Sequence, residues 1–208
     1  MTDWLRPHPI IPVVVADRSD IGADLAQALD AGGIACAEIT LRTPHALELL
    51  AAMSAGAPRG FVVGAGTVLD EEQVNRAADA GATFIVSPGY DPAVVDRARA
   101  LGLAVLPGVA TASEVQRARR DGLDAVKLFP ADRLGGLAMI EALAAVFPDM
   151  GFVPSGGVGP DNAAAYLAHS AVPAVSGSWL APRRQLDAGD LSGVTERGRA
   201  ALQARAAA

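Results

Sequence analysis

The chain has 208 residues with 17 basic and 23 acidic side chains, and its net charge of −6 with no basic run argues against a nucleic-acid partner. The one cysteine, Cys36, has no internal disulfide partner, and the start "MTDWLRPHPI" is too charged and proline-broken for a signal peptide or a membrane span. We therefore expect a cytoplasmic protein with no membrane partner, folded as one domain over residues 1–208.

Short apolar runs rich in Val and Ile alternate along the chain with amphipathic stretches, which predicts strands alternating with helices. The predicted strands cover residues 10–16, 36–41, 61–66, 83–87, 103–108, 125–129, 151–157 and 173–177. Because each strand is almost continuously apolar, we expect a parallel sheet that is covered by helices.

The ends of the predicted helices carry their own signals. Thr43 followed by Pro44 predicts a hydroxyl cap and a proline in the first helical turn, and Thr111 with Glu114 predicts a capping box. Glycines are expected to end the helices at Gly32, Gly81, Gly102 and Gly122.

Eight parallel strands leave two architectures, a closed barrel and an open doubly wound sheet. The number of strands favours a compact α/β fold, a single (β/α)8 TIM barrel preceded by an N-terminal extension or helix. An open sheet would most naturally bind a nucleotide, but "GAGTVL" (64–69) lacks the third glycine of a dinucleotide fingerprint, and the chain has no Gly-Lys phosphate loop.

In such a barrel the reactive side chains lie where strands end. Glu38, Thr40 and Arg42 share one side of the second strand because alternate residues point the same way. Glu38 and Arg42 could form a structural ion pair. Alternatively, the carboxylate carries protons and the guanidinium binds a carboxylate or phosphate.

Lys127 is the only lysine in the chain and ends the sixth predicted strand. It could be a chance survivor in an arginine-rich composition, but only a primary amine can form an imine with a ketone. Poor solvation beside Val126, Leu128 and Phe129 would favour the free amine, a nucleophile, whereas a nearby Glu38 would favour the ammonium. The sequence does not decide which effect dominates.

Glycine-rich segments follow the last two predicted strands, "PSGGV" (154–158) and "SGSW" (176–179). At this place such barrels commonly bind phosphate through backbone N–H groups, and Ser178 can add a hydroxyl donor. Singly, a Gly-Gly pair is more often just a turn. Further polar residues at strand ends are Thr67, Ser87, Ser155 and Ser176.

The motifs taken together and in order resemble one family over residues 8–200. They are "EITLRTPHAL" (38–47), "VGAGTVL" (63–69), "IVSPG" (85–89), "PGVATASE" (107–114), "VKLFPA" (126–131), "PSGGV" and "GSWL" (177–180). They resemble the bacterial 2-keto-3-deoxy-6-phosphogluconate (KDPG) aldolases, some of which also cleave 4-hydroxy-2-oxoglutarate (KHG).

The resemblance implies a class I aldolase, a carbon–carbon lyase of the Entner-Doudoroff pathway. It implies an eight-stranded barrel that forms a homotrimer and needs no metal or other cofactor. The expected substrate is a phosphorylated 2-oxo sugar acid, KDPG, cleaved to pyruvate and glyceraldehyde 3-phosphate, with KHG cleaved to pyruvate and glyoxylate as a second activity. The alternatives are an aldolase for the galactonate-derived isomer and a non-catalytic sugar-phosphate-binding barrel.

The resemblance also implies residue roles. Lys127 would form the imine with the C2 ketone and Glu38 would move protons. The implied substrate-binding residues are Arg42 and Thr67 for the carboxylate, Pro88 and Phe129 around the imine, and Gly156, Gly157 and Ser178 for the phosphate. Ser155 stands where threonine is frequent in the family, so the hydroxyl is kept and a methyl group is lost.

Three rival chemistries fit the sequence less well. A metal-dependent aldolase would need clustered ligands, but His8, His45 and His169 are widely spaced and share no strand end. Cys36 has no suitably placed histidine to activate it. A decarboxylase or epimerase of the sugar-phosphate type would need an acid beside Lys127 in the same strand, and this strand has none.

Overall fold

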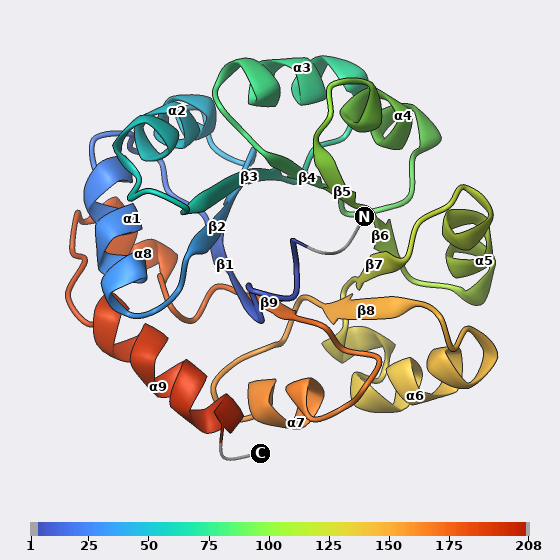
Figure 1. The fold of residues 1–208 in the computed structure, drawn as a ribbon. Coiled ribbons are helices and arrows are strands. Elements are labelled where there is room, and N and C mark those ends of the chain that lie inside the picture. The colour runs from blue at the N-terminus through green and yellow to red at the C-terminus, as the bar shows by residue number, and fades with distance from the viewer. Residues whose placement is uncertain (1–3, 207–208) are drawn as a thin grey trace.

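The computed structural model describes residues 4–206, in which strands and helices alternate along the chain (Figure 1). The strands are β1 (Ile10–Val14), β2 (Cys36–Thr40), β3 (Val62–Gly66), β4 (Phe84–Val86), β5 (Ala104–Leu106), β6 (Gly108–Val109), β7 (Ala125–Leu128), β8 (Gly151–Pro154) and β9 (Val175–Gly177). The helices are α1 (Gly22–Ala31), α2 (Ala46–Gly56), α3 (Glu71–Asp79), α4 (Pro92–Ala100), α5 (Ala112–Arg120), α6 (Leu137–Val146), α7 (Ala163–Leu167), α8 (Arg183–Asp187) and α9 (Val194–Ala206), with a 3₁₀ turn at Asp132–Leu134.

The described strands form two parallel sheets. One has six strands in the order β5-β4-β3-β2-β1-β9, and the other has three in the order β6-β7-β8. Every strand pair is parallel, and β1 lies between β2 and β9. The predicted α/β class with parallel strands is therefore confirmed.

The prediction of eight strands is wrong at one place, because the run 103–108 is divided into β5 and β6 at Pro107. Proline has no N–H to donate, so the ladder is interrupted there. Its carbonyl oxygen still accepts a hydrogen bond from the Lys127 amide at 2.9 Å, which joins it to β7. At the other edge of the three-stranded sheet, a single bridge between Ser155 and Ser176 links the ends of β8 and β9.

Figure 1 shows the strands in a ring with the helices outside it. One apolar core lies between the strands and these helices, and it contains residues of both. A second, smaller core contains strand residues and the N-terminal segment, so it fills the inside of the ring; we call it the apolar plug. Its buried members are Leu5, Ile11, Cys36, Phe84, Val86, Leu106, Ala125, Val153 and Ala174.

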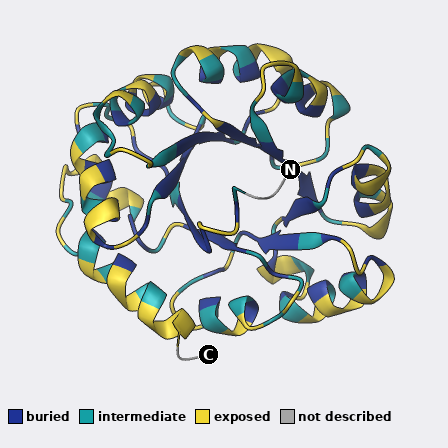
Figure 2. Cartoon of the chain, viewed as in Figure 1, coloured by how far each residue is buried: buried dark blue, intermediate teal, exposed yellow. Residues whose placement is uncertain are grey.

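The N-terminal extension closes one end of the plug. The sequence predicts an N-terminal extension or a helix here, and residues 4–7 form a turn without a helix. The Trp4 ring stacks on Phe84 with 4.4 Å between ring centroids. Figure 2 shows that the strands are buried and that the helices are exposed on their outer faces.

Of the predicted helix signals, the capping box and the left-handed glycines Gly81, Gly102 and Gly122 are confirmed, and Thr43 and Gly32 are wrong. Thr111 and Glu114 form the capping box of α5. Thr43 does not cap α2, which begins at Ala46, and its hydroxyl instead donates to the Ala16 carbonyl at 2.6 Å. After α1 the left-handed residue is Gly33 rather than Gly32.

None of the helices that the structure describes is long and apolar enough to cross a membrane.

Candidate active site

The structure brings Lys127 and Glu38 together inside the ring of strands. Lys127 lies on β7 and Glu38 on β2, 89 residues apart, and the lysine Nζ donates to Glu38 Oε1 at 3.3 Å. Lys127 is 6% exposed and Glu38 is 1% exposed. The alternative pairing of Glu38 with Arg42 is not among the ion pairs of the described residues, whereas the Lys127–Glu38 pair is.

The Glu38 carboxylate fits because the neighbouring strand β3 has a glycine, with no side chain, at that point. A Cβ built on Gly66 of β3 would overlap Glu38 Oε1. The second carboxylate oxygen, Oε2, accepts from the Ser176 hydroxyl at 3.4 Å. The role of Gly66 was missed by the sequence analysis, although a glycine inside a strand is a recognised signal of close approach.

A cavity of about 150 Å³ opens beside this pair. Phe129 connects the two, since it lines the cavity and its ring centroid is 5.4 Å from the Lys127 Nζ. Of the predicted site residues, the cavity is lined by Arg42, Phe129, Ser155, Gly156, Gly157 and Ser178. Residues predicted from four separate strand ends thus share one hollow.

The glycine segment after β8 has a backbone conformation that favours glycine. Gly156 and Gly157 have φ angles of +87° and +83°, which side-chain-bearing residues rarely adopt. A Cβ on Gly157 would also overlap Asp132. Asn162 closes the loop by donating to the Gly157 carbonyl at 2.9 Å, while its side-chain oxygen accepts from the Gly159 amide at 2.9 Å.

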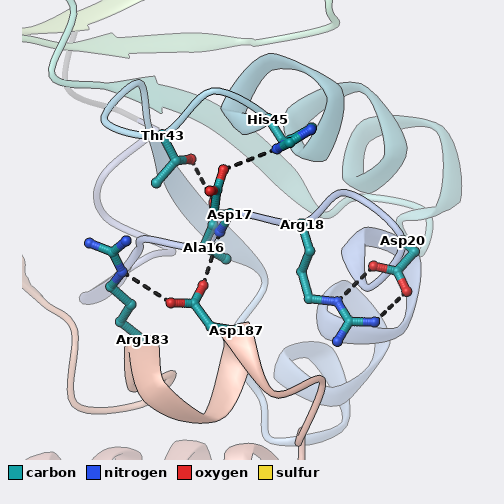
Figure 3. Close-up of polar contacts among 8 residues, drawn as sticks. All are labelled: Ala16, Asp17, Arg18, Asp20, Thr43, His45, Arg183 and Asp187. Carbon is teal, nitrogen blue, oxygen red and sulfur yellow. Dashed lines mark hydrogen bonds and ion pairs between the residues drawn. The ribbon is translucent and has the colours of Figure 1, made fainter.

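Arg42 follows the end of β2 and has an exposed side chain at the cavity. Its segment is held by a group of contacts that we call the rim clasp, formed by Ala16, Asp17, Thr43, His45, Arg183 and Asp187 (Figure 3). His45 Nδ1 lies 3.0 Å from Asp17 Oδ1. The Asp187 carboxylate accepts from the Asp17 amide at 3.0 Å and from Arg183 Nε at 3.1 Å.

The predicted site residues that do not line the cavity are Lys127, Glu38, Thr67 and Pro88. Thr67 directly follows β3 and has a φ of +58°, the one positive value outside glycine in the described chain. Such strain is commonly kept at functional sites. Pro88 follows β4, and its carbonyl packs so closely on Gly108 that a Cβ there would overlap it.

Cys36 lies in the apolar plug, two residues before Glu38 on the same strand face. Burial, and secondarily the charge of Glu38, raises the pKa of its thiol well above the usual range. Its Sγ lies 3.5 Å from the Ile10 carbonyl oxygen. Cys36 is therefore a buried free thiol.

Comparison with known proteins identifies the family. Residues 1–197 match the family model described as "KDPG and KHG aldolase". The 2-dehydro-3-deoxy-phosphogluconate aldolase of Treponema pallidum is 45% identical over 93% of this chain and 92% of its own length. The KHG/KDPG aldolase of Escherichia coli K12 is 37% identical over 96% of this chain and 93% of its own.

A solved structure gives the same result. The KDPG aldolase of Legionella pneumophila, with pyruvate captured as a covalent carbinolamine intermediate, superposes with a TM-score of 0.90 at 36% identity and covers 95% of each chain. The predicted family and its lyase class are therefore confirmed, and the chain belongs to the KDPG and KHG aldolase family.

Proposed function

We propose that this protein cleaves KDPG to pyruvate and glyceraldehyde 3-phosphate through an imine on Lys127, and that it also cleaves KHG to pyruvate and glyoxylate. The observation that carries the proposal is the buried contact of 3.3 Å between the chain's one lysine amine and the carboxylate of Glu38, beside a cavity. Family membership and the named activities of the relatives support it.

The reaction begins when the Lys127 amine attacks the C2 ketone, and loss of water from the carbinolamine leaves a protonated imine. This imine is an electron sink. Glu38 removes the proton of the C4 hydroxyl, the C3–C4 bond breaks, and its electron pair passes into an enamine while the C4 hydroxyl becomes the aldehyde. Protonation of the enamine at C3 and hydrolysis of the imine then release pyruvate and restore the amine.

The cavity lining supplies binding groups for both ends of the substrate. Arg42 provides a cation for the carboxylate of the 2-oxo acid, and we assign Thr67 to the same group. We assign the amides of Gly156 and Gly157 and the Ser178 hydroxyl to the phosphate oxygens. We also assign Phe129 and Pro88 to the surroundings of the imine, and Ser155 to the middle of the substrate.

In this proposal the two sheets act as one closed (β/α)8 barrel. The Ser155–Ser176 bridge joins them on one side, and Pro107 joins β5 to β6 on the other. We further propose that residues 1–208 work as one domain. The homotrimer and the cytoplasmic location stay predictions from the sequence.

The test is reductive trapping. The protein is incubated with pyruvate and borohydride, and its mass and proteolytic peptides are measured. We expect one reduced pyruvyl adduct on the peptide that contains Lys127. Since the chain has no other lysine, peptide mapping needs to separate only Lys127 from the N-terminal amine.

The matched control is Lys127→Arg, which keeps a cation against Glu38 but removes the primary amine. We expect no adduct on that peptide and a loss of KDPG cleavage of at least about 10³-fold, because removing a nucleophile that forms the covalent intermediate has effects of this order or larger. Absence of a mass gain in the unmodified protein at saturating pyruvate would contradict the proposal.

A further inference from the structure

The second carboxylate oxygen of Glu38 has a partner of its own. Ser176 on β9 donates to Oε2 at 3.4 Å, while Lys127 donates to Oε1 at 3.3 Å. We propose that Ser176 is a positioning residue that holds the Glu38 carboxylate in place while its proton content changes. This inference rests on the proposed function, in which Glu38 moves protons.

Ser176 is itself fixed by its neighbours. It pairs in register with Ile11 of β1 and forms the bridge to Ser155 at the end of β8. The side chain is 1% exposed and points to the inside of the ring, where its hydroxyl reaches Glu38. A buried hydroxyl without a partner costs free energy, so this contact is the reason a serine can occupy the position.

The chemistry of the two partners differs. A lysine ammonium can only donate hydrogen bonds, and Lys127 loses that form when it becomes an imine. A serine hydroxyl both donates and accepts. Ser176 can therefore donate to the Glu38 carboxylate and, after rotation, accept from the protonated acid. It is suited to hold Glu38 in both protonation states of the reaction.

The shape of the neighbouring backbone also fixes the position of the Glu38 carboxylate. Gly66 leaves the space that Oε1 occupies, so Glu38 is enclosed between a bare backbone and the Ser176 hydroxyl. Two other buried hydroxyls of the interior do not share the task. Thr40 donates to the Val14 carbonyl at 3.0 Å and Ser87 to the Gly89 carbonyl at 2.7 Å.

The experiment compares Ser176→Ala with the unmodified protein in three measurements: kcat for KDPG cleavage, exchange of the pyruvate methyl protons with deuterated solvent, and the pyruvate concentration that half-saturates borohydride trapping. We expect kcat and exchange to fall about tenfold, the low end for a hydrogen bond to a charged group, because the 3.4 Å contact is long. We expect half-saturation to stay within about twofold, since pyruvate binding itself does not use Glu38 as a proton carrier.

The matched control is Ser54→Ala. Ser54 also donates from its hydroxyl, to the Gly81 carbonyl at 3.2 Å, but it lies on α2 away from the cavity. This variant should turn over like the unmodified protein. Trapping of pyruvate by Ser176→Ala also shows that the variant is folded with an intact Lys127 site.

A double variant separates positioning from general loosening. If Ser176 acts through Glu38, adding Ser176→Ala to Glu38→Gln should lower the residual rate no further. The inference is overturned if Ser176→Ala turns over like Ser54→Ala, or if the rate losses of Ser176→Ala and Glu38→Gln multiply in the double variant. It is also overturned if the pyruvate concentration for half-saturation rises as much as kcat falls. Each of these results leaves the trapped adduct of the unmodified protein, and hence the proposed function, intact.

Discussion

The apolar plug and the polar residues above it are carried by the same strands, only two residues apart. Because alternate residues of a strand share a face, a step of two residues moves from one region to the other. The plug and polar residues that follow each other in this way are Cys36 and Glu38, Ala125 and Lys127, Val153 and Ser155, and Ala174 and Ser176. We call the second members of these pairs the polar layer.

The two regions obey different rules for burial. Side chains of the plug stabilise the fold in proportion to the apolar surface they remove from water, and they need no specific partner. A buried charge such as Glu38 or Lys127 is costly unless it is paired and hydrogen-bonded. The contacts among Lys127, Glu38 and Ser176 meet this requirement. Stability should therefore depend mainly on the plug, and chemistry on the polar layer.

Glu38→Gln tests the polar layer and has the largest expected effect of the substitutions that compare the two regions. Glutamine keeps the shape and still accepts from Lys127, but it cannot move a proton. We expect kcat for KDPG cleavage to fall by about 10²- to 10³-fold, the range for a general acid–base group. Borohydride trapping of pyruvate should persist. Unchanged turnover would assign Glu38 to structure and remove the chemical role of the polar layer.

Phe84→Leu probes the plug. Phe84 is fully buried, stacks on Trp4 and lies where Gly64 leaves space for its ring. We expect the free energy of unfolding to fall by about 1–2 kcal/mol, because leucine leaves part of the ring volume empty. Denaturant unfolding measures this, and kcat of the folded variant should stay within about twofold.

Phe61→Leu is the matched control for Phe84→Leu, since Phe61 is only partly buried and packs on the outer core. It should destabilise less than Phe84→Leu. If Phe84→Leu instead lowers kcat strongly while leaving unfolding unchanged, the separation between plug and polar layer is wrong.

The sequence predicts local features of both regions well. Runs of Val and Ile predict the strands within a few residues, and strand alternation predicts which side chains share a face with Glu38. It places Lys127 and Glu38 at strand ends, but not beside each other, because their contact depends on how β2 and β7 are arranged around the ring.

Features that depend on distant parts of the chain are the ones that sequence reasoning misses. Thr43 has the pattern of a helix cap, yet its hydroxyl bonds the Ala16 carbonyl because the segment after β2 packs on the segment after β1. Gly66 is recognisable as a glycine in a strand, but only the fold shows that Glu38 fills its space. Pro107 similarly divides a strand that apolar periodicity predicts as continuous.

His45→Gln tests a region outside both layers, the rim clasp, and should have the smallest effect. The hydrogen bond with Asp17, followed by the charge of Glu48, raises the pKa of His45 above its ordinary 6.5. The protonated form is therefore favoured by folding, so its stabilisation is fully present below about pH 6.5 and is lost as the pH rises through the raised pKa. The pair is exposed, so its contribution is small and weakens with salt.

We expect the unmodified protein to melt at a higher temperature than His45→Gln at about pH 5.5, and the difference to vanish by about pH 9, where His45 is neutral in both states. Asp17→Asn should reduce the same pH-dependent difference, because it removes the partner that raises the pKa most and leaves only the charge of Glu48. A melting difference between the unmodified protein and His45→Gln that is equal at both pH values would show that His45 stabilises the rim by packing instead of by charge. In that case the rim clasp would obey the rule of the apolar plug.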